Sequence, residues 1–327
     1  MSHSSLEPHP HGLRGLPFLM VTVVMWAVGP IFVKYFTAYY NVWTQNAFRY
    51  SCAAVILVAA MSVRGRRGYR LNRGQWGKLL LVTGANLLMQ TNFCLVYYYM
   101  YPAVASLLGR VSIIFVTVLS FILFHDERRV IRSPYFLTGS ALALAGVVFV
   151  LANRDPELLA HLEVSDRDFW IGAGLAVSFA FFVSVYALTI KHAVRDIPPL
   201  VSFTHVSWMT ALGLTLLMLV AGGGADLWRQ PVLPLGLMVV SALLSIVFAH
   251  SCYYAALRHI KAVVSTSLLQ LTPLVTCVCS AIVYGDRLTP LQIAGGGAVI
   301  VGAWLAALAQ AKAGGRDKPT TDAAAPP

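Results

Sequence analysis

The chain has 327 residues, of which 58% are hydrophobic and 11% are charged, and its formal net charge is +11. Soluble domains usually carry about 25% charged residues to cover their surface, so this composition excludes an ordinary water-soluble domain. The basic excess does not indicate nucleic-acid binding, because the basic residues lie in short segments between long apolar runs and form no single stripe. The composition therefore predicts an integral membrane protein.

Ten apolar runs follow one another between Leu16 and Ala311, and each is long enough to cross a bilayer as a helix. The third and fourth runs are almost continuous. We separate them between Tyr101 and Pro102, because proline removes a backbone donor and disfavours helix just before it. We predict an all-α membrane protein with spans at residues 16–33, 42–63, 79–101, 102–124, 134–152, 169–190, 199–221, 232–257, 262–284 and 290–311.

Most of the 24 basic residues lie in alternate connections, beginning with the N-terminal segment. Because cytoplasmic loops carry the excess of Lys and Arg, this bias predicts a multi-pass protein of the inner (plasma) membrane with both termini in the cytoplasm. Residues 1–12 and 312–327 have the simple composition of disordered tails. The histidines of the first tail have no further ligands at fixed spacing, so we expect no metal and no cofactor.

The two halves of the chain resemble each other. AVASLLGRVSIIFVTVLSFILFHDER, which begins at Ala103, aligns without gaps with AVVSTSLLQLTPLVTCVCSAIVYGDR, which begins at Ala262. After a three-residue deletion the match continues through the glycines of the last helix in each half. We predict two related five-helix units, residues 13–153 and 169–311. Since five is odd, consecutive units enter the membrane from opposite sides and the repeat is inverted, as in many secondary transporters.

FILFHDERRVIRSPYFLTGSALALAGVVFVLA and AIVYGDRLTPLQIAGGGAVIVGAWLA each place an acidic residue at the end of a fourth helix, before a glycine-bearing fifth helix. MWAVGPIFVKYF in the first helix is followed by Arg49 in the second. Together these motifs resemble the drug/metabolite transporter superfamily, ten-helix proteins with two EamA-type repeats, over about residues 16–311. The resemblance implies transport of small metabolites, often the export of amino acids or drugs.

Two positions depart from the family pattern. The second repeat has Asp286 where glutamate is usual, and Ile114 replaces the mid-helix proline seen at the matching Pro273. The two halves are therefore expected to flex unequally, with Pro273 as a gating position. The first helix also lacks the glutamate on which the small multidrug proton antiporters of this superfamily depend, which disfavours proton-coupled export of cationic drugs.

Polar side chains inside the spans define a candidate substrate site. Helical spacing places Asn86, Gln90 and Tyr97 on one face of the third span, and Ser265 and Thr272 on one face of the ninth. Polar groups in lipid-spanning segments should face one another or a wet cavity. We predict a hydrated chamber at mid-depth where these faces meet. The alternative is that the side chains only hydrogen-bond between helices.

Arg110 lies about 13 Å into the fourth span by helical rise, and no Asp or Glu lies inside any predicted span. We hypothesise that it binds a substrate carboxylate, with a purely structural role as the alternative. For Arg49, which is similarly deep and recurs in the family, we favour a structural or gating role. Histidine is the side chain whose ordinary pKa lies near neutral pH, and His250 is a candidate to line the site, as are the rings of Trp26 and Tyr253. Packing alone is the alternative for all three.

The predicted function is a secondary transporter that exports small, amino-acid-like metabolites by alternating access. Import or exchange of an anionic organic metabolite is the alternative, and a membrane sensor without transport is a remote one. No nucleophile with its base and no metal motif favours an enzyme. The expected partners are a small-molecule substrate and the lipid bilayer, without nucleic acid. The glycine-rich fifth helices permit close helix approach within the monomer or in a homo-oligomer.

Overall fold

The computed structural model of the protein describes residues 10–65, 69–123, 133–153, 155–193, 197–221, 223–257 and 268–314. All regular secondary structure in these ranges is helical. Nine of the described helical segments are long and apolar enough to cross a membrane, and Thr272–Tyr284 is a shorter apolar helix. The all-α class is therefore confirmed for the described residues. The count of ten spans stays a prediction, because residues 262–267 of the ninth lie outside them.

The described residues of the first half form six helices and one short 3₁₀ turn. They are α1 (Pro10–Phe36), α2 (Val42–Val63), α3 (Arg73–Tyr99), α4 (Pro102–Leu108), η1 (Gly109–Val111), α5 (Ser112–Leu123) and α7 (Pro134–Ala152). The predicted separation of the third and fourth spans is confirmed, since α3 ends at Tyr99 and Pro102 begins α4. Helix α3 begins earlier than residue 79, because Asn72 and Gln75 form a capping box ahead of the apolar run.

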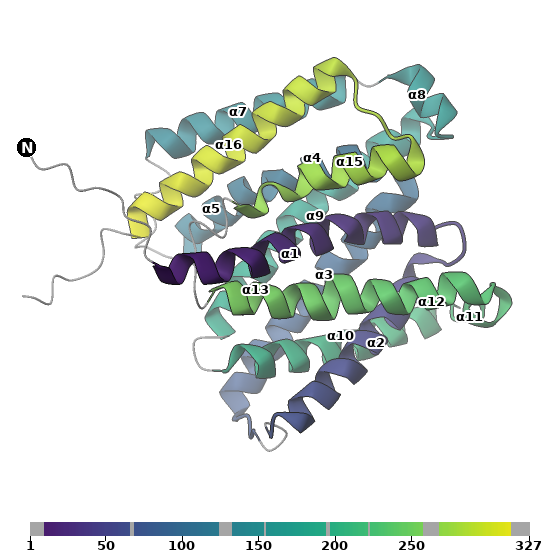
Figure 1. Ribbon diagram of the computed structural model, residues 1–327, viewed down its shortest axis with the longest axis vertical. Helices are drawn as coiled ribbons and strands as arrows, with labels where there is room; N and C mark the ends of the chain where they lie inside the picture. Colours follow the sequence, from purple (N-terminus) through teal and green to yellow (C-terminus); the bar gives the residue numbers. More distant parts are fainter. Residues whose placement is uncertain are drawn as a thin grey trace, which may run out of the picture.

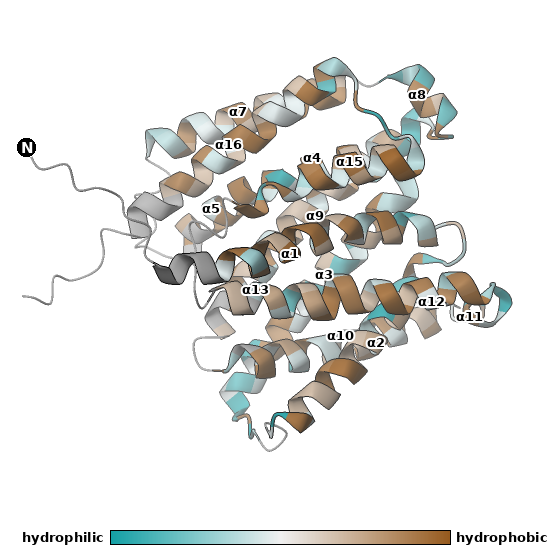
Figure 2. Cartoon of the chain, in the orientation of Figure 1, coloured by the Kyte–Doolittle hydropathy of each residue, from teal (hydrophilic) through white to brown (hydrophobic). Residues whose placement is uncertain are grey.

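A short helix, α8 (Pro156–His161), connects the halves. The second half contains α9 (Asp166–Ala193), α10 (Pro199–Val220), α11 (Asp226–Arg229), α12 (Val232–Ser241), η3 (Ala242–Phe248), α13 (Ala249–Leu257), α15 (Thr272–Tyr284) and α16 (Pro290–Gly314). Figure 2 shows that hydrophobic residues dominate the long helices, while hydrophilic residues gather at α8 and α11. This distribution fits a bundle with apolar surroundings along its sides and water at its ends.

Three spans that the sequence predicts as continuous helices are interrupted. The fourth narrows to the 3₁₀ turn η1, and the eighth widens to the π-helical segment η3. In the ninth, a turn at Gln270 and Leu271 precedes α15. Pro273 explains this last break, because its ring nitrogen cannot donate to the carbonyl four residues earlier. Such breaks leave backbone groups available to side chains of neighbouring helices.

The helices pack as pairs from different halves of the chain. Helix α7 lies along α16, α3 against α9, α2 against α10, and α1 against α13 and α15. Helix α1 begins and α16 ends at one end of the bundle, while α8 and α11 lie at the opposite end (Figure 1). We call the latter the α8 end. Which end faces the cytoplasm stays a prediction.

Helices α7 and α16 touch backbone to backbone. A Cβ atom added at Gly139 would lie 2.6 Å from the carbonyl oxygen of Gly302, and one at Gly146 would lie 2.6 Å from that of Gly295. No side chain fits at such distances, so glycine is required at the crossing. The residue numbers rise along α7 as they fall along α16, and the two helices are therefore antiparallel. The close approach expected from the glycines occurs within the monomer.

Candidate functional site

Three of the predicted site residues form one aromatic cluster. The ring centroid of Trp26 on α1 lies 5.2 Å from that of His250 and 5.3 Å from that of Tyr253, both on α13. Phe203 of α10 stacks on the imidazole with centroids 4.7 Å apart. The Nδ1 atom of His250 lies 2.9 Å from the carbonyl oxygen of Ile246 in η3. The cluster therefore joins α1, α10 and the eighth span through flat, mostly apolar faces.

The polar face predicted on α3 is occupied by protein partners. Asn86 donates to the hydroxyl of Thr210 at 2.9 Å and, more weakly, to that of Tyr50 at 3.4 Å. The side chain of Gln90 also hydrogen-bonds to Tyr50. Tyr97 is buried about two turns beyond Gln90 on the same helix. In this conformation Asn86 and Gln90 thus connect α3 to α2 and α10, as the interhelical alternative describes.

The backbone carbonyl of Leu269 connects Arg110 and Thr272 beside the helix break at Pro273. Arg110 Nη1 donates to the carbonyl oxygen of Leu269 at 3.3 Å, and Thr272 Oγ1 donates to the same oxygen at 2.7 Å. Leu269 is four residues before Pro273, so its carbonyl lacks the backbone N–H that a regular helix would supply from that position. The arginine of the first half therefore stabilises the break that proline creates in the second. The predicted site residue Ser265 lies outside the described residues.

Arg49 is the most deeply buried charged side chain of the candidate set, with 3% of its surface exposed. Its Nη2 donates to Ser245 Oγ at 3.1 Å, and Nη1 makes a long contact of 4.0 Å with Cys94 Sγ. Nε has no hydrogen-bond partner among the described residues. Leaving a buried donor unpaired costs about 1–3 kcal/mol. This guanidinium is therefore only partly satisfied by the protein.

Tyr97 lies within electrostatic range of both guanidinium groups, those of Arg49 and Arg110. No acidic side chain of the described residues pairs with either arginine, in keeping with the absence of acids from the predicted spans. A region with two positive charges, one buried and one half-buried, and no carboxylate favours an anion over a cation. We call Arg49, Tyr97 and Arg110 the central cluster. Its two arginines support an anion site more strongly than Arg110 alone does.

Three of the candidate site residues are buried in this conformation, and the hydrated chamber at mid-depth stays a prediction. Arg49 and Asn86 each expose 3% of their surface, and Tyr97 exposes 4%. The reason is that polar side chains from neighbouring helices satisfy one another, which removes the need for water at most of these positions. Gln90, Arg110 and His250, in contrast, are only half-buried.

The α8 end contains a buried carboxylate that the sequence marked only as a family feature. Asp286 Oδ2 accepts hydrogen bonds from the backbone N–H of Ala103 at 2.9 Å and from Ser280 Oγ at 2.6 Å. It therefore caps the start of α4 from the connection between α15 and α16. Burial raises the pKa of Asp286, and this effect outweighs the two hydrogen bonds and the charge of Lys34, which lower it. Lys34 Nζ lies 4.0 Å over the ring of Tyr101.

A second carboxylate ties the loops of the α8 end together. Asp226 Oδ2 accepts from the side-chain amide of Asn41 at 2.9 Å and from its backbone N–H at 3.3 Å. Thr44 accepts from the backbone N–H of Gly224 at 2.9 Å. Asp226 and Asp286 both belong to the second half, and each holds the start of a helix of the first half. Contacts between the halves thus close the bundle at this end.

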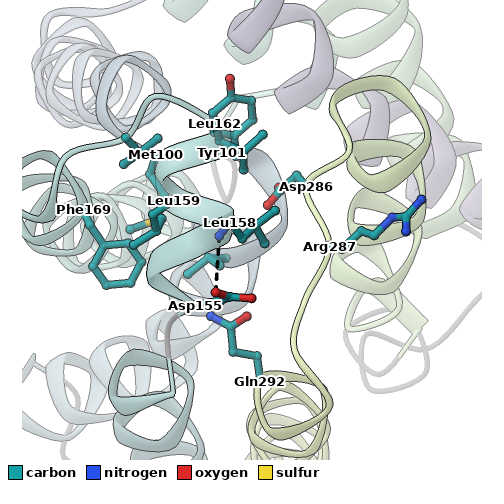
Figure 3. Close-up of a pocket in the computed structure, with 12 residues that line it drawn as sticks. Met100, Tyr101, Asp155, Leu158, Leu159, Leu162, Phe169, Asp286, Arg287 and Gln292 are labelled. Atoms are coloured by element: carbon teal, nitrogen blue, oxygen red, sulfur yellow. Dashed lines mark hydrogen bonds between the residues drawn. The ribbon is translucent and has the colours of Figure 1, made fainter.

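A surface pocket lies at the α8 end (Figure 3). Its walls include Met100, Leu158, Leu159 and Phe169, with Asp286 at its edge. Figure 3 shows the Asp155 carboxylate accepting the N–H of Leu158 at the start of α8, at 3.3 Å. None of the predicted substrate-binding residues lines this pocket. It is a feature of the loops, separate from the central cluster.

Sequence reasoning missed Ser245, Gln45 and Ser241 as members of the central site. Gln45 is four residues before Arg49 on α2, and Ser241 is four residues before Ser245. A search for polar pairs at four-residue spacing would have found both. No spacing rule indicates the π-helical segment that places Ser245 beside Arg49. Among the described residues, no group of three or more His, Cys, Asp or Glu side chains is placed to hold a metal ion.

The fold and the central cluster define a class of protein, namely a multi-pass α-helical membrane protein whose two halves pack on each other around buried polar groups. The chain belongs to the EamA-like transporter family, which matches residues 13–152 and 170–308 as two repeats. A solved crystal structure of a protein has the same fold, with a TM-score of 0.62 at 16% sequence identity over 90% of this chain and 97% of that chain. No curated protein matches closely enough to count as a relative. The resemblance to the drug/metabolite transporter superfamily is confirmed.

Proposed function

We propose that this protein is a secondary transporter of the inner membrane that exports small, amino-acid-like metabolites by alternating access, with no catalytic step. Membership of the EamA-like family supports a small-molecule substrate and a membrane setting. The export direction, the ten-helix count, the units 13–153 and 169–311, and cytoplasmic termini are part of the proposal. So is the inverted relation of the two repeats, on which alternating access depends.

The crossing of α7 and α16 carries this proposal. The repeat alignment pairs Gly139 with Gly295 and Gly146 with Gly302. In space Gly139 faces Gly302 and Gly146 faces Gly295. If each glycine is replaced by its partner in the repeat alignment, the contact of Gly139 with Gly302 becomes the contact of Gly295 with Gly146. Equivalent helices that pack antiparallel belong to units of opposite orientation, which supports an inverted repeat.

Other helix pairs follow the same exchange. Helix α3, the third of the first half, packs against α9, the first of the second half. Helix α13, part of the third span of the second half, packs in turn against α1. A binding site between such halves can open to either side when they rock. The central cluster of Arg49, Tyr97 and Arg110 lies among these helices and is the proposed substrate region.

Import or exchange of an anionic organic metabolite is the second candidate. The observation that favours it is the pair of arginines near Tyr97 without an acidic partner among the described residues. An exported amino acid offers a carboxylate too, but its ammonium group finds no acid in the spans. The two candidates therefore share a requirement for a negative group and differ in the need for a positive one.

Counterflow into proteoliposomes tests the proposal. Purified protein is reconstituted with unlabelled internal substrate, and uptake of labelled amino acids, organic acids and sugar phosphates is compared with that of protein-free liposomes. We expect saturable uptake of at least one amino acid. Uptake of organic acids alone would favour the second candidate. An absence of flux for every class would contradict transport, and constant flux between about pH 5.5 and 8 would remove His250 from any proton coupling.

A further inference from the structure

Four buried polar side chains lie on α2 and on the eighth span, which pack against each other. Gln45 and Arg49 lie four residues apart on α2, and Ser241 and Ser245 lie four residues apart across the junction of α12 and η3. The bond between Asn41 and Asp226 joins the starts of the two segments, so they run in the same direction. Arg49 contacts Ser245, which places Gln45 at the level of Ser241. We call these four residues the α2–η3 seam.

This seam concentrates unpaired polar atoms. Seven buried side-chain polar atoms lack a hydrogen-bond partner in the described part of the chain, and three of them are Gln45 Oε1, Ser241 Oγ and Arg49 Nε. Buried polar groups in proteins are nearly always paired. Three such exceptions on two helices that pack together favour a polar partner that the described residues do not supply.

The charge of the seam defines the partner. The guanidinium of Arg49 is 3% exposed and has no acidic partner among the described residues. The edge formed by Nε and Nη2 carries one hydrogen bond, to the neutral hydroxyl of Ser245. That edge presents two parallel N–H groups, which match a carboxylate in the bidentate arrangement. The missing partner is therefore an anion with two oxygens.

The aromatic cluster lies next to this edge. A Cβ atom on Gly29 of α1 would lie 3.3 Å from Ser245 Cβ, and Trp26 is one turn before Gly29. His250, which lies against Trp26, is held at 2.9 Å from the carbonyl oxygen of Ile246, the residue after Ser245. A ligand whose carboxylate reaches Arg49 can therefore place an apolar body against these two rings.

We propose that the α2–η3 seam is the anion subsite of the transporter, in which Arg49 binds the carboxylate of the substrate after displacing the Ser245 hydroxyl. The proposal rests on the proposed transport function and assigns the substrate class as carboxylates with an apolar or aromatic body. In the present structure the Ser245 hydroxyl occupies part of the guanidinium fork. The wider turn of the π segment gives this stretch of the eighth span a local adjustment that a regular helix lacks.

Ligand-dependent thermal unfolding of the detergent-purified full chain tests the subsite without requiring transport. The probes are 3-phenylpropionate, its carboxamide, L-phenylalanine and inorganic phosphate. We expect both carboxylates to raise the unfolding temperature and the carboxamide to leave it unchanged. Arg49→Gln should lose the shift, with an apparent affinity about 10- to 100-fold weaker, as expected when a charged hydrogen-bonded pair is removed. Arg64→Gln, an exposed arginine after the end of the same helix, is the matched control and should keep it.

Two results would overturn the subsite: no difference between carboxylate and carboxamide in the wild-type protein, or equal stabilisation of Arg49→Gln. Stabilisation by phosphate alone would contradict the carboxylate assignment. If Arg49→Gln does not fold, Arg49→Lys keeps the charge without the fork and should bind the carboxylates more weakly, while the wild-type comparison stands by itself. Specific binding without flux in proteoliposomes would contradict transport and leave the subsite, whereas unchanged KM for carboxylate flux in Arg49→Gln would contradict the subsite alone.

Discussion

Two contacts between the halves of this protein are built in opposite ways. At the α7–α16 crossing, glycines let two backbones touch, with no polar side chain between Gly139 and Gly302. In the α2–η3 seam, a buried arginine meets a serine and leaves one donor unpaired. The first contact packs two backbones closely, whereas the second leaves a hydrogen-bond donor of Arg49 unpaired. The difference is consistent with α7 and α16 as a fixed support and with the proposed anion subsite in the seam.

The largest expected effect is at the crossing. In Gly302→Ala the new Cβ would lie 2.5 Å from the backbone nitrogen of Ala143 and from the carbonyl oxygen of Gly139. Both neighbours are backbone atoms, so α7 and α16 must separate. We expect a loss of about 3 kcal/mol or more in the free energy of unfolding, measured by thermal or denaturant unfolding in detergent.

Gly297→Ala on the same helix is the control for that variant. Nothing lies within 4 Å of a Cβ at position 297, so this change should be neutral or slightly stabilising, because alanine favours helix. Equal stability of the two variants would mean that the helices slide past each other freely. The crossing would then lose its role as a fixed support.

A substitution in the seam should raise the stability of the protein, in contrast to Gly302→Ala at the crossing. Arg49→Met removes an uncompensated buried charge and keeps most of the side-chain volume, and Ser245 retains its bond to the carbonyl oxygen of Ser241 at 2.6 Å. Replacing buried charges by apolar groups of similar size often stabilises proteins by about 1–4 kcal/mol. We expect the ligand-free variant to unfold at a higher temperature than the wild type and to lose carboxylate transport. A clear loss of stability would instead assign Arg49 the structural role that the sequence favours.

The sequence predicts the architecture better than the site, for physical reasons. The solvent around each segment determines its composition, which is apolar in the spans and basic in alternate connections. These features, like the proline at position 102, are local, so the sequence alone predicts them. Trp26, His250 and Tyr253, which the sequence names as candidate lining residues, lie together in the structure, while their role in substrate binding stays a prediction. The contact of Arg49 with Ser245 joins distant segments through a π-helical turn, and no local pattern contains that information.

The Leu269 carbonyl offers a smaller test of how the halves are coupled. In the wild type this oxygen accepts from Arg110 because Pro273 cannot donate to it. Pro273→Ala restores a backbone donor, so loss of the Arg110 guanidinium should then reduce the free energy of unfolding by a smaller amount. We expect Arg110→Met to cost about 1 kcal/mol less in the Pro273→Ala background than alone, measured as the coupling energy of a double-mutant cycle. Additive effects would show that the two residues act independently.

The smallest expected effect is the pH dependence at Asp286, which lies outside the spans. Because burial raises its pKa in the folded protein, the folded state holds the proton more tightly than the unfolded chain does. The resulting stability is complete below the ordinary aspartate value of about 4 and is lost as the pH rises through the folded pKa. The unfolding temperature of the wild type relative to Asp286→Asn should therefore fall over this window. The reverse slope would mean that Ser280, Ala103 and Lys34 stabilise the ionised Asp286 carboxylate more than burial destabilises it. The carboxylate at the α8 end would then be fully paired, whereas the Arg49 guanidinium in the seam is not.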